Sequence, residues 1–269
     1  MKSSTQFKPQ TNVAVLNVGD PGSGKTRLAM AFPRPGILDC DGNLTSAVRV
    51  SNGKEFYYSQ PFKTDDDKEV PEVDRWNRAV SETKLLLTSP NVDTFVLDGL
   101  SNLCRWGLVH TENELTKAGI NIKKEYLAKY QSFIPLLSNF ITMLRIPGKY
   151  VVVNVHQLME KDELSGAIRY YLDIPGRLAG TLGGQFTDVW GMASIADPGS
   201  KVGAKYSVRT KPSGFHVNLK TSLDLEPSID ITGKNPSEIW AILEPKLSVN
   251  VKPATPSPTN GPTQLPAKA

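Results

Sequence analysis

The chain has 269 residues, of which 39% are hydrophobic and 22% are charged, and its formal net charge is +4. This composition supports one sizeable folded domain and excludes a chain that is disordered throughout. Residues 1–10 lack the apolar core of a signal peptide and no apolar run is long enough to span a membrane, so we expect a cytoplasmic protein without membrane contact. Cys40 and Cys104 stand alone, which indicates neither a zinc site nor a disulfide framework.

The first predicted strand, residues 13–18, leads into Gly-Asp-Pro-Gly-Ser-Gly-Lys-Thr at residues 19–26, and a predicted helix follows at 26–32. This loop matches the Walker A pattern G-x-x-x-x-G-K-[ST] at every defined position. A strand, a glycine loop and a helix direct backbone N–H groups at phosphate oxygens. The pattern predicts a nucleotide site formed by Gly19, Asp20, Pro21, Gly22, Ser23, Gly24, Lys25, Thr26 and Arg27. No base-recognition motif typical of GTP-binding proteins is present, which favours ATP.

Strands and helices alternate along the rest of the chain. Apolar runs predict strands at 36–42, 56–58, Thr94–Asp98 and Tyr150–Val155, and helical spacing predicts helices at 76–87, 103–115 and 126–144, the last with a kink at Pro135. Residues 158–176 are polar and indicate an excursion containing a β-hairpin that turns at Ser165 and Gly166. A helix at 177–184, strands at 189–195, 205–209 and 215–220, and a helix at 235–243 complete the pattern.

This order predicts an α/β fold with a mainly parallel central sheet and helices on both faces. The late strands have no helices between them, so we expect antiparallel strands added at one edge. We expect one domain at 11–245, preceded by a flexible lead-in at 1–10 and followed by a disordered, Pro-rich tail at 246–269.

Acidic residues follow two of the predicted strands. Asp98 ends a buried strand, where a carboxylate can help Thr26 to hold Mg²⁺ beside the phosphates. Asp39 and Asp41 end the second strand, and one of them, preferably Asp41, can position the water that attacks the phosphate. Both also suit a structural role as turn-forming aspartates before Gly42.

His156 and Gln157 end the strand Tyr150–Val155. An amide at this point can sense the γ-phosphate and pass its presence to the next loop as an order–disorder switch. We favour Gln157 for this role, because a single histidine after a strand is more often structural than catalytic. Lys25, Asp41 and Gln157 are therefore the predicted catalytic residues.

Together, the Walker A loop, the strand ending at Asp41, the strand ending at Asp98 and the strand followed by Gln157 resemble the RecA core. More narrowly, the chain resembles small phage-encoded AAA-type nucleotide-binding proteins, a group that includes single-strand annealing recombinases. The resemblance implies a water-activating acid at Asp41, where the family usually has Glu, and it therefore implies slow hydrolysis. It also implies that residues 158–176 contact single-stranded DNA, and it implies a host cytoplasmic setting if the gene is carried by a phage.

The resemblance directs attention to basic and aromatic residues. Tyrosines can stack on bases while cations hold phosphates, and the candidates in the excursion are Lys161, Arg169, Tyr170 and Tyr171. Packing of the tyrosines on the sheet is the alternative. A second contact is expected from Lys117, Lys123 and Lys124. Arg209 and Lys211 are candidates for trans-acting cations that reach a neighbouring subunit's γ-phosphate, which requires a homo-oligomeric ring or filament.

Three hypotheses follow. The first is an ATP- and Mg²⁺-dependent protein that binds single-stranded DNA and promotes annealing or strand exchange, with weak ATPase activity and a single-strand binding protein as a further candidate partner. The second is a P-loop ATPase that acts on protein partners, such as a helicase loader or an assembly factor. The third is a small-molecule kinase, which the lack of an arginine cluster after the central strands disfavours. The acid-free stretch at 199–222, with five basic residues, favours nucleic acid as the partner over protein.

Overall fold

The computed structural model describes residues 13–161, 163, 166, 168–199, 203–212 and 218–247. The predicted lead-in at 1–10 and residues 248–269 of the predicted tail lie outside this part of the chain. Within the described residues, no helix combines the length and apolar character needed to cross a membrane.

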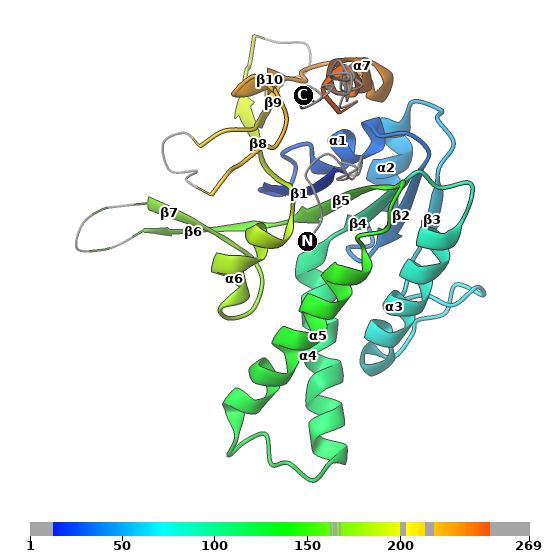
Figure 1. Ribbon diagram of the computed structural model, residues 1–269, viewed down its shortest axis with the longest axis vertical. Coiled ribbons are helices and arrows are strands. Elements are labelled where there is room, and N and C mark those ends of the chain that lie inside the picture. Colours follow the sequence, from blue (N-terminus) through cyan, green and yellow to red (C-terminus); the bar gives the residue numbers. More distant parts are fainter. Residues whose placement is uncertain are drawn as a thin grey trace, which may run out of the picture.

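An eight-stranded sheet in the order β10-β9-β8-β1-β5-β4-β2-β3 organises the domain (Figure 1). The strands from β8 to β3 in this order are parallel, whereas β9 and β10 are antiparallel additions at one edge. Their bounds are β1 Ala14–Gly19, β2 Pro35–Asp39, β3 Tyr57–Ser59, β4 Thr94–Asp98, β5 Tyr150–Val155, β8 Asp188–Ala196, β9 Ala204–Arg209 and β10 Ser228–Asp230. The prediction of a mainly parallel sheet with antiparallel strands at one edge is confirmed.

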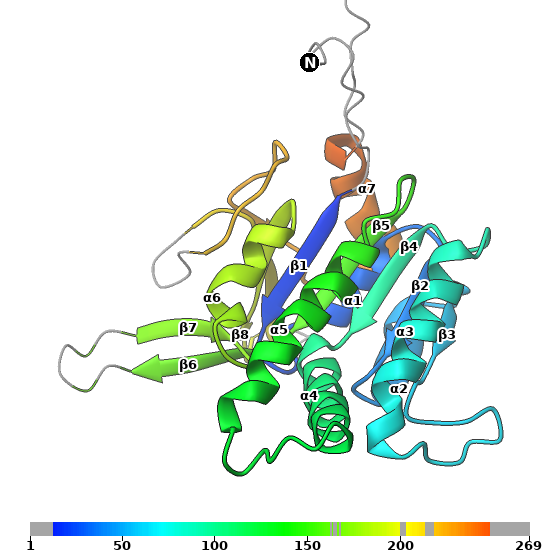
Figure 2. The same ribbon diagram turned by 60° about the horizontal axis from the view of Figure 1, so that its bottom comes forward.

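Helices cover both faces of this sheet, as Figures 1 and 2 show. One face is covered by α3 Glu72–Thr88, α4 Leu100–Lys117, α5 Tyr126–Met143 and α6 Leu178–Thr181, and the other by α1 Lys25–Ala31, α2 Leu44–Ser51 and α7 Pro236–Leu247. Alternation along the strands supplies both cores: in β5, Val151 and Val153 face the first group of helices and Val152 faces the second. This is why the central strands are apolar at almost every position.

The excursion after β5 is a separate two-stranded sheet, β6 Gln157–Lys161 paired antiparallel with β7 Ile168–Leu172. The predicted hairpin is therefore present; of its two expected turn residues, Gly166 has a positive φ of 68° and Ser165 lies outside the described residues. Its base is closed by the Asp173 N–H, which donates to the His156 carbonyl over 2.8 Å. Figure 1 shows this hairpin projecting away from the main sheet.

Several element predictions need correction. The helix expected at 177–184 is a short α6 followed by a 3-10 turn, Leu182–Gln185. Residues 215–217 of the strand expected at 215–220 lie outside the described chain, and Lys220 makes an isolated bridge to Val189. The outermost edge strand is β10, and it was not predicted from the sequence. Helix α2 was also not predicted, and α7 extends past the expected domain end at 245.

Candidate nucleotide-binding site

The glycine loop between β1 and α1 has the backbone that a phosphate cradle needs. Gly22 and Gly24 have φ values of 75° and 96°, a region that residues with side chains rarely adopt. Gly19 is fixed by space instead, because a Cβ there would lie 2.6 Å from Ser23 Oγ and 2.8 Å from the Met192 carbonyl oxygen. The backbone conformation at Gly22 and Gly24 and the lack of space at Gly19 therefore each require glycine.

The side chain of Lys25, the first residue of α1, reaches back to the start of this loop. Its Nζ donates hydrogen bonds to the carbonyls of Gly19 and Asp20, each over 2.8 Å, and lies 3.3 Å from His156 Nδ1. Burial lowers the pKa of Lys25, and the nearby charges of Asp98 and Asp41 act in the opposite direction. The ammonium is thus held mainly by neutral carbonyls, so a bound anion would be its favourable partner.

Asp98 at the end of β4 is connected to the loop through buried side chains. Its Oδ2 accepts a hydrogen bond from Thr26 Oγ1 over 2.9 Å, and its Oδ1 accepts one from Asn154 Nδ2 over 3.0 Å. Asn154 in turn accepts from Asn17 Nδ2 over 2.9 Å, and the same Asn17 amide donates to the Lys25 carbonyl. Burial raises the pKa of Asp98, while the hydrogen bonds from Asn154 and Thr26 oppose the rise. A cation beside Thr26 would offset the cost of ionising this carboxyl.

The hydroxyl oxygen of Thr26 and the carboxylate of Asp98 suit Mg²⁺ as ligands. This ion binds one or two carboxylates and completes its coordination shell with phosphate oxygens and water. Thr26 and Asp98 would hold the ion, which would neutralise charge on the phosphates. Within the described chain, no three His, Cys, Asp or Glu side chains gather as a metal site.

Asp41 and Asp39 have different surroundings. Asp41 lines the cavity beside the loop: Asn102 Nδ2 donates to its Oδ1 over 2.8 Å, and His156 Nε2 lies 3.4 Å from its Oδ2. Burial acts to raise the pKa of Asp41, but hydrogen bonds from His156 and Asn102 outweigh it, and the pKa lies below its ordinary value. Asp39 is buried; its Oδ1 accepts from three successive backbone N–H groups, starting at Asp41, and its Oδ2 accepts from Gln60. Asp39 thus stabilises the turn that presents Asp41.

A cavity of about 600 Å³ opens beside the loop, within the size range of small-molecule sites. It lies at the carboxyl ends of β1, β2, β4 and β5, where ligands bind in such sheets. Arg27 and Tyr206 form one wall, with the Arg27 guanidinium carbon 5.5 Å from the centre of the Tyr206 ring. A flat ring backed by a cation is a surface on which a nucleobase can stack.

The structure does not bring Gln157 into this cavity. Gln157 begins β6 and lines a different cavity, whereas its neighbour His156 contacts both Lys25 and Asp41. His156 therefore occupies the position beside the phosphate site that was expected for the Gln157 amide. The reason is that the chain turns from β5 into β6 here, which directs the two successive side chains to different sites.

The nucleic-acid candidates are distributed over several elements. Lys161 is exposed at the end of β6, and Arg169, Tyr170 and Tyr171 belong to β7. A separate group of exposed lysines lies at the tip of the α4–α5 hairpin, which Figure 1 shows projecting in another direction: Lys117, Lys123 and Lys124.

The candidate trans-acting cations lie at the end of β9. Arg209 pairs with Gly191 of β8 and Ser228 of β10, and Lys211 is exposed just beyond it. Neither residue lines the chain's own nucleotide cavity, to which β9 contributes Tyr206 instead.

Four residues of the site were not predicted from the sequence: Asn17, Asn154, Asn102 and Tyr206. The first two carried a signal, because an amide inside an apolar, doubly buried strand must find a hydrogen-bond partner, and register pairs Asn154 with both Asn17 and Asp98. Asn102 and Tyr206 carried no comparable signal, since a polar residue on a helix and an aromatic residue in a strand are ordinary.

Comparison with known proteins assigns the chain to a family. No curated protein matches the sequence. Among solved structures, a KaiC-like protein of the hyperthermophilic archaeon Pyrococcus horikoshii OT3 is 13% identical, with a TM-score of 0.43 and coverage of 82% of this chain and 90% of that one. Flagellar accessory protein FlaH of Methanocaldococcus jannaschii is 12% identical, with a TM-score of 0.37 and coverage of 82% and 85%. The family model described as "AAA domain" matches residues 11–236. The chain therefore belongs to the AAA-domain family, and it is a P-loop nucleotide-binding protein.

Proposed function

We propose that this protein binds ATP with Mg²⁺ and binds single-stranded DNA, and that the bound nucleotide controls the DNA contact, so that the protein promotes annealing or strand exchange in phage recombination. One observation carries the proposal: His156 contacts Lys25 and Asp41, and the residue after it begins the β6–β7 hairpin. A change at the phosphate site therefore has a direct covalent path to the hairpin that carries Tyr170 and Tyr171.

Hydrolysis would be slow for a physical reason. Asp41 is the acid positioned to orient an attacking water, but its carboxylate already accepts a hydrogen bond from Asn102 and lies beside His156. These partners lower the pKa of Asp41, which makes it a weaker base for removing a proton from water. Lys25 would bind the phosphate oxygens and offset the charge that develops on them.

The experiment that tests the proposal is fluorescence anisotropy of a labelled single-stranded oligonucleotide, with and without Mg²⁺–ATP, across a salt series. We expect affinity that depends on nucleotide and falls steeply with salt, because displaced counterions accompany each phosphate contact. A Lys25→Ala variant should lose the nucleotide dependence. Binding of equal strength with and without ATP would contradict nucleotide control, and absence of binding would contradict the DNA-binding function.

One feature favours a second candidate, an ATPase that acts on a protein partner. Leu158 and Met159 on β6 are 54% and 64% exposed, so each face of the hairpin carries an exposed apolar side chain that a protein partner could cover. In this second candidate function, the protein is a helicase loader or an assembly factor, and the hairpin binds its target protein. A Leu158→Ser and Met159→Ser variant should then lose partner-stimulated ATPase activity while its affinity for single strands is unchanged.

A further inference from the structure

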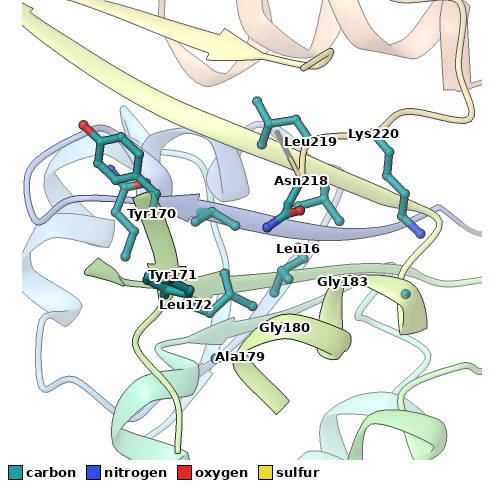
Figure 3. A pocket seen from close by; sticks show the side chains of 14 residues that line it. Leu16, Tyr170, Tyr171, Leu172, Ala179, Gly180, Gly183, Asn218, Leu219 and Lys220 are labelled. Atoms are coloured by element: carbon teal, nitrogen blue, oxygen red, sulfur yellow. The ribbon is translucent and has the colours of Figure 1, made fainter. Parts of the chain in front are cut away.

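A second cavity, of about 220 Å³, lies on the α6 side of the sheet beneath the base of the β6–β7 hairpin (Figure 3). It is distinct from the nucleotide cavity, and none of its lining residues lines the nucleotide cavity. Its floor continues the hydrophobic core, with Leu16, Leu172 and Val189 in contact with it. In Figure 3, Tyr170 and Lys220 lie on opposite sides of the opening, with Leu16 and Leu172 between them.

The size of this cavity limits its occupant. An engineered protein cavity of about 150 Å³ accepts a benzene molecule, and sites for drug-sized ligands start at about 300 Å³. At about 220 Å³, the cavity fits one flat aromatic group and is too small for a whole nucleoside triphosphate. An aromatic group would also find suitable neighbours, because Tyr170 and Tyr171 line the rim.

The polar groups at the rim indicate which kind of aromatic group the cavity would bind. Gln157 and Asn218 bring amides, which can donate to and accept from the edge of a base, and Lys220 brings a cation. The described residues that line the cavity include no carboxylate. An apolar peptide side chain would need neither the amides nor the cation, whereas a nucleobase with its phosphate uses both.

The wall that carries Lys220 is held rigidly. Lys220 and Val189 exchange two backbone hydrogen bonds, of 2.8 and 3.0 Å. Next to it, the buried Asp188 carboxylate accepts hydrogen bonds from Thr221 Oγ1, the Ser222 N–H and Ser222 Oγ over 2.7 to 3.0 Å. A wall fixed in this way loses little conformational entropy when a ligand binds.

We propose that this cavity takes one unstacked base of a single-stranded nucleic acid, with the adjoining phosphate at Lys220. The inference rests on the proposed single-strand binding function and specifies the contact that the strand makes. Because Gln157 lines this cavity and His156 contacts the phosphate site, two successive residues would connect base capture with the nucleotide.

Gly180 of α6 offers a way to fill the cavity without a clash. It lines the cavity, its φ is not positive, and a Cβ built on it meets no atom within 4 Å. Gly180→Leu should therefore fold and occupy the space meant for the base, and its thermal unfolding midpoint checks the fold. Thr181→Leu is the matched control, because Thr181 is the exposed next residue and does not line the cavity.

The probes are labelled oligothymidylate and a strand of equal length in which every base is replaced by an abasic tetrahydrofuran, both measured by anisotropy with Mg²⁺–ATP. Wild type and Thr181→Leu should bind the base-bearing strand about 5- to 150-fold more tightly, the range that corresponds to about 1–3 kcal/mol of stacking per base. Gly180→Leu should bind the two strands about equally. A Lys220→Ala variant should lose about one phosphate contact from the salt slope.

The outcomes separate the two proposals. If wild type binds neither strand, the single-strand function fails and the base site fails with it. If wild type prefers the base-bearing strand and Gly180→Leu keeps that preference, only the base site is overturned. The same comparison with a base-bearing and an abasic ribose strand distinguishes DNA from RNA. The base site requires tighter binding of the base-bearing strand in at least one of the two pairs.

Discussion

At the scale of the residue, the pair Asp39 and Asp41 shows how two acids of identical chemistry take different roles. Asp39 accepts successive backbone hydrogen bonds and is buried, whereas Asp41 faces the nucleotide cavity. A buried carboxylate with both oxygens hydrogen-bonded stabilises a turn, and a partly open one beside Lys25 can act on a ligand. The assignment of roles therefore predicts different consequences of substitution.

Asp41→Asn should keep Mg²⁺–ATP binding and lower kcat by about 10²- to 10⁴-fold, the usual range for removing a general base. Steady-state ATPase assays and a binding titration with a non-hydrolysable analogue measure the two effects. Asp39→Asn is the matched control: it should lower the free energy of unfolding by about 1–3 kcal/mol through weakened turn hydrogen bonds. An unchanged kcat in Asp41→Asn would reduce Asp41 to a turn residue as well.

His156 predicts a shift in pH dependence. Its hydrogen bond and charge help to hold the pKa of Asp41 below its ordinary value against the opposing effect of burial. Without the imidazole, the pKa of Asp41 rises, so a smaller fraction is ionised at any acidic pH. The acid limb of the kcat–pH profile should therefore move to higher pH in His156→Ala. His110→Ala, which alters the described histidine on α4 away from the cavity, should leave the limb in place. If the acid limb of the kcat–pH profile does not move in His156→Ala, the contact between His156 and Asp41 has no role in catalysis.

At the scale of the element, packing decided what local pattern could not. Helix α2 contains β-branched residues and no strong cap, yet it forms because Ala47 is buried against the second core together with Leu44 and Val50. Strand β10 has only three residues and forms because β9 offers it an unpaired edge. By contrast, the hairpin β6–β7 followed from polarity and a glycine turn.

The hairpin carries a prediction of its own. Replacing Tyr170 and Tyr171 together by Ala should weaken single-strand binding by about 1–3 kcal/mol for each base that loses its stacking partner. The chain offers a matched control in Tyr57 and Tyr58, adjacent tyrosines that are 40% and 57% exposed on β3, at the opposite edge of the sheet. Anisotropy titrations of both double variants test the assignment, and equal losses in the two would remove the hairpin from the binding surface.

At the scale of the whole molecule, the proposed oligomer predicts complementation between inactive subunits. If Arg209 acts on a neighbour's phosphate, then Lys25→Ala and Arg209→Ala are each defective in a different half of a shared site. A mixture of the two should recover ATPase activity beyond the sum of its parts, because some interfaces combine an intact Lys25 with an intact Arg209. Lys211→Ala, paired in the same way, tests the second candidate cation. If the ATPase rate of a mixture only equals the sum of the rates of its two variants, the residue tested does not act on a neighbouring subunit.

The sequence alone determined the glycine loop, most of the strands and helices along the chain, and the acids at strand ends, because these depend on local rules. A Walker A loop needs particular residues at particular spacings, and doubly buried strands need continuous apolar runs. These rules predict the mainly parallel sheet with its antiparallel addition, and they place Lys25, Thr26, Asp41 and Asp98 together at the carboxyl ends of its strands.

The tertiary structure decided which side chains meet across that edge. His156 rather than Gln157 contacts Lys25 because the chain changes direction from β5 into β6, and such a turn depends on long-range pairing. The Asn17–Asn154–Asp98 connection depends on strand register, and the wall made by Arg27 and Tyr206 joins residues far apart in the chain. The cavity below the hairpin has the same origin, since its walls come from β1, β7, β8 and α6, which only the packed sheet brings together.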